Sequence, residues 1–259
     1  MDAIMEPDAL SVLFQPIFEI SPGGRRLRMV EGLIRGPKGT NVERADVLFE
    51  YVRRKQAECV VDRLCIEAVL REAKKLPFDC EFAINVHGST LSRDEGLVPF
   101  LVQTAEADQI PTGRITLEII DSPLFGDKSR FYSSLESLRD LGMRIAVDDA
   151  GLGQTNYRMM LECRPDYFKV HRHVVGGCGT DLYREAVIES ISHLVTRFGA
   201  KVVADGIENV SDLNVVGSKG IELVQGFLLC PPVTAMELMS ADFIGGKLMS
   251  AAAPMRKSA

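Results

Sequence analysis

The sequence of 259 residues contains no tryptophan, six scattered cysteines and no run of 18 or more apolar residues. No two cysteines have the C-x-x-C spacing of a zinc or redox site, so we expect buried thiols in a reducing compartment. The missing apolar run argues against a membrane-spanning helix. The first residues are acidic and lack the basic start of a signal peptide. We therefore expect a cytoplasmic protein with no membrane insertion.

An excess of positive charge is also absent. Lys and Arg total 30 against 36 Asp and Glu, which gives a formal net charge of −6 at pH 7. Binding to a nucleic-acid backbone relies on many Lys and Arg contacts and usually shows as a basic domain. We therefore expect no DNA partner. An acidic chain can still bind a phosphorylated ligand through divalent cations held by carboxylates.

Apolar periodicity predicts alternating strands and helices. Short runs rich in Val, Ile, Leu or Phe predict strands at 12–18, 28–35, 81–86, 114–119, 144–148, 167–170, 201–204 and 221–224. Longer amphipathic segments predict helices at 45–55, 60–75, 95–107, 129–141, 157–163, 182–198, 210–219 and 235–243. The composition, with 46% hydrophobic and 25% charged residues, is that of a globular chain.

This alternation favours an α/β fold of one domain, a (β/α)8 TIM-like barrel. An open doubly wound sheet is the alternative, but no G-x-G-x-x-G follows an early strand. The first two strands are joined only by a short SPGGRR turn, so we expect the first strand to be antiparallel. We place the domain at residues 10–245, with loose termini at 1–9 and 246–259.

Polar side chains stand at the carboxyl ends of these strands, which meet at one mouth of a barrel. They are Glu31, Asn85, Glu118, Asp148, Asp149, Lys169, Asp205, Glu208 and Gln225. Any one of the carboxylates could simply cap the following helix. Together, six carboxylates would repel one another unless cations neutralised them. Oxygen ligands suit Mg²⁺ or Mn²⁺, and two such ions about 3.5–4 Å apart are the usual arrangement for phosphodiester hydrolysis.

The motifs that contain these residues resemble those of one known family. In chain order they read QPI (15–17), EGLIR (31–35), IN (84–85), LEIID (117–121), VDDAGLG (147–153), YFKV (167–170), VADGIEN (203–209) and VQGF (224–227). This series is similar to the EAL domain, whose members hydrolyse cyclic di-GMP to the linear dinucleotide pGpG. The family fold is a modified (β/α)8 barrel with an antiparallel first strand.

The resemblance implies a role for each matching residue. Six residues match metal ligands for one or two Mg²⁺ or Mn²⁺ ions: Glu31, Asn85, Glu118, Asp148, Asp149 and Asp205. Catalytic roles fall to Glu31, Lys169 and Asp205, where Lys169 orients water or stabilises charge and Asp205 is the proposed base. Ligand-binding or supporting roles fall to Gln15, Arg35, Glu208 and Gln225. The implied partner is cyclic di-GMP, and a homodimer or a regulatory protein partner is also left open.

Several positions depart from the family pattern. Asp205 stands where active members carry Glu, and its carboxylate is retracted by roughly 1.5 Å, a displacement that can cost about 100-fold in rate. Gly32 replaces the Ala of the namesake motif, and the loop at 149–156 lacks the family's Phe, Thr and Tyr. Asp121 and His171 are further replacements. We therefore expect slow hydrolysis of cyclic di-GMP. The alternative is an inactive domain that acts as a receptor or protein-interaction module.

Three histidines carry weaker expectations. His87 follows Asn85 at the predicted mouth and could contact a ligand. His171 and His173 flank Arg172 just after a strand, and we expect a loop or supporting role for them more than metal ligation.

Overall fold

The computed structural model describes residues 1–77, 80–120, 127–150 and 155–240, with backbone only at 149–150 and 155–158. Within these residues, strands β1 to β8 form a closed barrel in sequence order. The strands are β1 (Ser11–Ser21), β2 (Gly24–Arg35), β3 (Glu81–His87), β4 (Ile115–Ile120), β5 (Arg144–Ala150), β6 (Tyr167–Val170), β7 (Lys201–Ala204) and β8 (Leu223–Val224). The barrel prediction is confirmed, and the doubly wound sheet is excluded because β1 pairs with β8.

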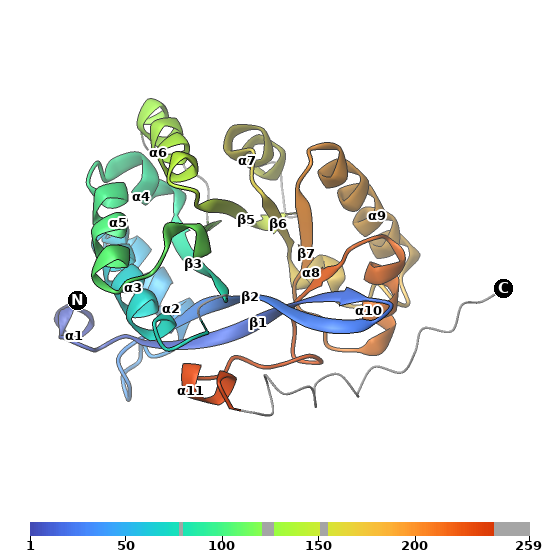
Figure 1. The fold of residues 1–259 in the computed structure, drawn as a ribbon, viewed down its shortest axis with the longest axis horizontal. Helices are drawn as coiled ribbons and strands as arrows, with labels where there is room; N and C mark the ends of the chain where they lie inside the picture. Colours follow the sequence, from blue (N-terminus) through green and yellow to red (C-terminus); the bar gives the residue numbers. More distant parts are fainter. Residues whose placement is uncertain (78–79, 121–126, 151–154, 241–259) are drawn as a thin grey trace.

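Helices surround the strands (Figure 1). They are α1 (Asp2–Met5), α2 (Ala45–Arg54), α3 (Glu58–Ala73), α4 (Gly88–Arg93), α5 (Leu97–Ala107), α6 (Lys128–Asp140), α7 (Thr155–Cys163), α8 (Arg172–Val175), α9 (Leu182–Arg197), α10 (Val210–Ser218) and α11 (Ala235–Leu238), with a 3-10 turn at Thr112–Arg114. In the described part of the chain, no helix is both long and apolar enough to cross a membrane.

The first strand runs against its neighbours, as predicted. β1 pairs antiparallel with both β2 and β8, whereas β2 to β8 are joined by parallel pairing. A tight turn between Ser21 and Gly24 connects β1 to β2 and leaves no room for a crossover helix. As a result, the direction of β1 is reversed while β2 to β8 share one carboxyl end.

Alternation along the strands separates two kinds of environment. Residues such as Val30 pack outward against the helices, whereas a separate apolar layer fills the barrel interior. This layer consists of Ile17, Met29, Ala146, Tyr167, Val203 and Leu223. Two residues along each of these strands, on the same face, stand Gln15, Glu31, Asp148, Lys169, Asp205 and Gln225. The apolar layer is therefore the floor beneath the predicted site.

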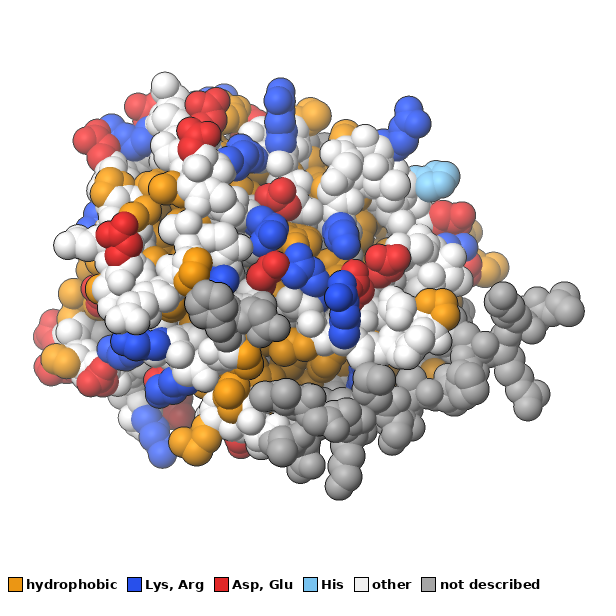
Figure 2. Space-filling view, viewed as in Figure 1, with side chains coloured by type: hydrophobic (Ala, Val, Ile, Leu, Met, Phe, Trp, Pro, Cys, Tyr) orange, Lys and Arg blue, Asp and Glu red, His pale blue; other side chains and the backbone are white. Residues whose placement is uncertain are grey.

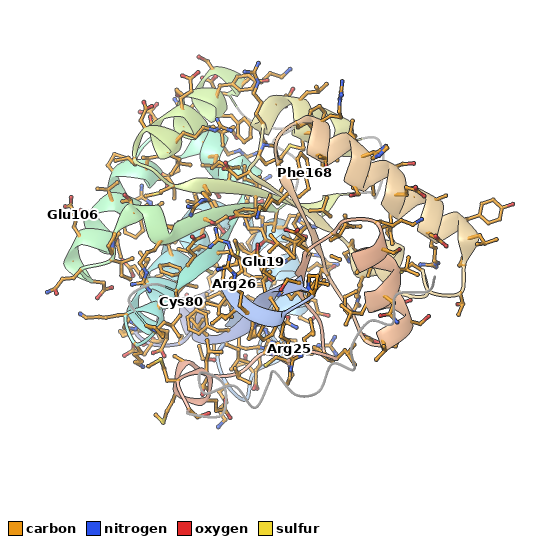
Figure 3. All side chains as sticks on the ribbon, turned by 45° about the vertical axis from the view of Figure 1, so that its right-hand side comes forward. Glu19, Arg25, Arg26, Cys80, Glu106 and Phe168 are labelled. Carbon is orange, nitrogen blue, oxygen red and sulfur yellow. The ribbon has the colours of Figure 1, made fainter. Side chains whose placement is uncertain are left out.

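The opposite mouth of the barrel carries charge pairs. Each carboxylate oxygen of Glu81 forms an ion pair with an arginine. Oε1 lies 2.7 Å from Arg28 and Oε2 lies 2.9 Å from Arg144. Glu19 pairs with Arg26, and the two side chains lie close together at the β1–β2 hairpin (Figure 3). Charged side chains of both signs also gather in the middle of the face shown in Figure 2. Pairing with arginines therefore compensates the charges of Glu19 and Glu81 at this mouth.

The chain ends differ from the sequence-based expectation. Residues 1–9 were expected to be loose, but α1 buries Ile4 against the hydrophobic core, and the Met1 ammonium donates to the Tyr51 hydroxyl at 3.1 Å. The helix expected at 235–243 ends at Leu238. The predicted loose terminus at 246–259 lies outside the described residues. Helices α4 and α8 were not predicted because they span six and four residues, too short to show a helical period.

The surroundings of Gly32 explain why this barrel has glycine where the namesake motif has alanine. A Cβ atom at Gly32 would lie 2.8 Å and 3.0 Å from the two methyl groups of Val69 on α3. Val69 is buried and β-branched, so it has little freedom to move aside. The Val69 methyl groups therefore occupy the space that an alanine methyl would need.

We predict that Gly32→Ala overpacks this contact and lowers the free energy of unfolding by about 1–3 kcal/mol. In a Val69→Ala background the same substitution should cost clearly less, because the clashing methyl groups are gone. Urea denaturation of the four proteins measures the coupling. An equal loss in both backgrounds would show that Val69 is not the cause.

Candidate active site

Side chains from six strands meet at the carboxyl-end mouth of the barrel. Glu31, Lys169, Asp205 and Gln225 each lie two residues beyond a member of the apolar floor on the same strand face. We call this group the mouth cluster: Glu31 (β2), Asn85 (β3), Glu118 (β4), Lys169 (β6), Asp205 (directly after β7) and Gln225 (directly after β8). Glu31, Glu118, Lys169 and Gln225 are almost completely buried, while Asn85 and Asp205 are half-buried.

Lys169 is the centre of the mouth cluster. Its ammonium donates to Glu31 Oε2 at 2.8 Å and to Glu118 Oε1 at 2.7 Å. Both distances are those of charge-assisted hydrogen bonds. One buried cation thus bridges two buried carboxylates that come from different strands.

Amide side chains complete the surroundings of Glu31. Asn85 Nδ2 donates to Glu31 Oε1 at 2.9 Å, and Gln225 Nε2 donates to Glu31 Oε2 at 2.8 Å. Gln225 Nε2 also lies 3.3 Å from Gln15 Oε1, and Gln15 Nε2 donates to the Cys230 carbonyl at 3.3 Å. Both oxygens of Glu31 are therefore held in fixed directions, and the amide orientation leaves Asn85 Oδ1 as an acceptor that could bind a cation.

The charges in the cluster shift one another's pKa values. Burial opposes ionisation of Glu31, but Lys169 and the donated hydrogen bonds outweigh it and lower the pKa of Glu31. Burial raises the pKa of Glu118 well above its usual value, with the charge of Glu31 adding to the effect. For Lys169, burial favours the neutral form, yet the carboxylates outweigh it and raise its pKa well above the usual value. Lys169 is therefore a permanent cation at neutral pH.

Asp205 is suited to accept a proton. Burial raises the pKa of Asp205 and, although Lys169 opposes the shift, the charges of Glu31 and Asp148 add to it. Asp148 is half-buried at the end of β5 and also acts on the pKa values of Glu118 and Lys169, so it lies within electrostatic range of the cluster. A carboxylate with a raised pKa is a stronger base than one in water.

Other predicted site residues lie farther out or cannot be placed. Arg35 ends β2 and donates to the neighbouring Ile34 carbonyl at 3.0 Å. Glu208 is exposed after β7 and lines a hollow of about 390 Å³ together with Arg172 and Arg184. The side chain of Asp149, residues 151–154 of the altered loop, and Asp121 lie outside what the structure describes.

The three histidines are not gathered with these carboxylates. His87 is buried, and its Nδ1 lies 2.8 Å from Asp62 Oδ1 on α3. His171 caps α8 by accepting the backbone N–H of His173 at 3.1 Å. Asp62 was missed by sequence reasoning, although a carboxylate between Val61 and Cys65 on the apolar face of a helix was an available signal.

The residues present fit hard divalent cations. Their donors are carboxylate and amide oxygens, the class that Mg²⁺ and Mn²⁺ prefer. Among the described side chains at this mouth, the four carboxyl groups of Glu31, Glu118, Asp148 and Asp205 face a single ammonium, that of Lys169. Among the described residues, no three His, Cys, Asp or Glu side chains already surround a common point as a metal cage. Asn85 would add an amide oxygen to these donors, and the side chain of Asp149 is not among the described side chains.

Comparison with known proteins decides the family. The model of the EAL domain matches residues 1–232. The chain belongs to the EAL domain family. Relatives of this EAL protein include the cyclic di-GMP phosphodiesterase PdeB of Shewanella oneidensis, 26% identical over 88% of this chain and 27% of the relative. Another is the cyclic di-GMP phosphodiesterase NbdA of Pseudomonas aeruginosa, 24% identical over 97% of this chain and 32% of the relative. The chain thus spans about a third or less of these relatives.

Solved structures show the same fold. An EAL domain protein from Listeria monocytogenes superposes with a TM-score of 0.79 at 20% identity, covering 92% of this chain and 93% of the other. Klebsiella pneumoniae BlrP1, in a complex with calcium and cyclic di-GMP, gives a TM-score of 0.77 at 24% identity, covering 89% of this chain and 59% of the other. The barrel of this EAL protein is therefore the family barrel.

We predict that Lys169→Met destabilises the metal-free protein by about 3–5 kcal/mol at pH 8, because two buried carboxylates lose their cation. Without Lys169, burial dominates and the pKa of Glu31 rises. The folded state then binds more protons than the unfolded chain, whose Glu residues titrate near about 4.3, so stability falls as pH rises from 5 to 8. Thermal unfolding in EDTA across that range should show a steeper fall than in the parent.

Lys201→Met is the matched control. Lys201 is half-exposed and lies 3.6 Å from Glu19 at the opposite mouth, so its loss should cost less than about 1 kcal/mol. Parallel pH profiles for Lys169→Met and the parent would show that Lys169 does not set the ionisation of the cluster.

Proposed function

We propose that this EAL protein is a metal-dependent phosphodiesterase that hydrolyses cyclic di-GMP to linear pGpG, at a slow rate. The observation that carries the proposal is the mouth cluster, in which oxygen donors from several strands converge around one buried lysine. The phosphodiesterase names of PdeB and NbdA support the substrate. A calcium and a manganese complex of BlrP1 with cyclic di-GMP support divalent metals, of which we propose Mg²⁺ or Mn²⁺.

Each residue of the cluster would contribute a defined action. When bound, divalent ions lower the pKa of water and neutralise phosphate oxygens. Glu31, Asn85, Glu118, Asp148 and Asp149 would hold these ions, with Asp205 beside them. Asp205 would take the proton of the attacking water, as its raised pKa favours. Lys169, kept protonated by its carboxylate neighbours, would stabilise negative charge that develops on the phosphate.

The outer residues would bind the rest of the dinucleotide. Arg35 at the end of β2 offers a guanidinium for a phosphate group. Glu208 lies on the rim. Gln225 would orient Glu31 directly, and Gln15 would support Gln225 by accepting a hydrogen bond from its Nε2. The domain limits 10–245, a homodimer, a regulatory protein partner and a cytoplasmic location stay predictions.

Hydrolysis is tested directly with the purified chain. We expect it to convert cyclic di-GMP to pGpG in Mn²⁺ or Mg²⁺, followed by chromatography, and to lose activity in EDTA. Glu31→Ala should reduce turnover by at least about 100-fold, because it removes a carboxylate that would hold the metal ion and that Lys169 contacts. Lys201→Met, at the far mouth, should keep full activity. Product formation that Glu31→Ala leaves unchanged would contradict the proposal.

A second candidate is a receptor that binds cyclic di-GMP without turnover. The observation that favours it is the aspartate at position 205, whose side chain has one methylene fewer than that of Glu. Asp205→Glu extends the base by roughly 1.5 Å and should raise turnover by about 10- to 100-fold if reach limits the rate. Single-turnover kinetics in Mn²⁺ measure it. Binding in Ca²⁺ together with no product from either protein would favour the receptor.

A further inference from the structure

The end of β3 that carries Asn85 lacks a strand neighbour on one side. Pairing of β2 with β3 runs from Met29 opposite Glu81 to Gly32 opposite Ile84, and stops there. Pairing of β3 with β4 continues to His87 opposite Ile120. Residues 85–87 are thus held by β4 alone among the described strands.

Asp62 on α3 provides the hydrogen-bond acceptor for the backbone at this end of β3. Its Oδ2 accepts the backbone N–H of His87 at 3.0 Å, and its Oδ1 lies 2.8 Å from His87 Nδ1. Thr90, in the first turn of α4, donates its hydroxyl to the same Oδ2 at 2.5 Å. A carboxylate only accepts hydrogen bonds, so His87 Nδ1 carries the proton in this contact. Three donors around the strand end thus converge on one side chain.

This small network is shielded from bulk water. Asp62 and His87 are each 1% exposed and Thr90 is 0% exposed, so bulk water does not reach their polar atoms. The Phe49 ring packs edge-on against the His87 ring, with centroids 5.7 Å apart. Removing the acceptor would leave a buried backbone N–H unpaired, which costs free energy unless the strand end moves.

We infer that Asp62 is a positioning residue for Asn85 and, through it, for the candidate metal site. By fixing the backbone of His87, Asp62 sets where Asn85 projects two residues earlier on the same strand face. From that position Asn85 Nδ2 reaches Glu31 Oε1 at 2.9 Å and presents Oδ1 to the mouth. The assignment of a metal to this site rests on the proposed function, whereas the effect on Asn85 geometry does not.

The test compares Asp62→Ala with a matched control in the full chain. Asp212→Ala is the control, because Asp212 is 2% exposed and also accepts three hydrogen bonds, from Gly177, Gly179 and Asn209. Each variant removes a buried carboxylate and leaves three donors without that acceptor. Asp62→Asn would be a weaker test, because the new amide can donate to His87 Nδ1 once the ring proton moves to Nε2. Thermal unfolding should show comparable losses of stability.

Two measurements separate positioning from general destabilisation. The first is the side-chain amide NMR signal of Asn85 in metal-free protein, identified by its absence in Asn85→Ala. It should shift or broaden in Asp62→Ala and stay in place in Asp212→Ala. The second is Mn²⁺ activation of cyclic di-GMP hydrolysis. Asp62→Ala should raise the half-activating Mn²⁺ concentration at least tenfold, with turnover at saturating Mn²⁺ within about threefold of the parent.

An unmoved Asn85 signal in Asp62→Ala would overturn the inference. So would an unchanged Mn²⁺ requirement in a variant that has lost stability. If the parent chain does not hydrolyse cyclic di-GMP, the proposed function fails while the NMR comparison still decides the role of Asp62. If Asp62→Ala does not fold, Thr90→Val removes one of the three hydrogen bonds and should shift the Asn85 signal in the same direction by a smaller amount.

Discussion

The buried ammonium of Lys169, bonded to Glu31 and Glu118, is the interaction on which the rest of the site depends. Two carboxylates this close and this well buried would repel strongly in a medium of low dielectric constant. One cation between them, with amide donors on Glu31, makes the arrangement tolerable. The same interaction keeps Lys169 charged and Glu31 ionised, while Glu118 is left with a raised pKa.

The barrel builds this site by simple alternation. A dry layer of apolar side chains fills the interior, and the next inward-facing residues are the polar ones at the mouth. The closed ring of strands brings together groups that are remote in sequence, such as Glu31 and Lys169, 138 residues apart. At the other mouth, Arg28 and Arg144 neutralise the carboxylate of Glu81. The floor keeps water away from one side of the cluster, which strengthens its electrostatic interactions.

The departures from the family motifs have different physical meanings. Gly32 is compensated, because the Val69 methyl groups take the space of the missing alanine methyl. Asp205 keeps its place in the electrostatics of the cluster but has a shorter reach than Glu. The effect of each replacement, at Gly32 and at Asp205, therefore depends on the residues that surround it.

The sequence by itself determined the class of fold and the strands on which polar residues stand. Strand periodicity and the short SPGGRR turn were sufficient for the barrel and its antiparallel first strand, because these patterns are local. Only the tertiary structure decided which polar groups touch. The contacts of Lys169 depend on strands meeting in space, and so does the hydrogen bond from the His87 backbone N–H to Asp62, 25 residues away on a helix. The pKa shifts at the mouth arise in the same way, because the closed barrel both removes water and brings charged groups next to one another.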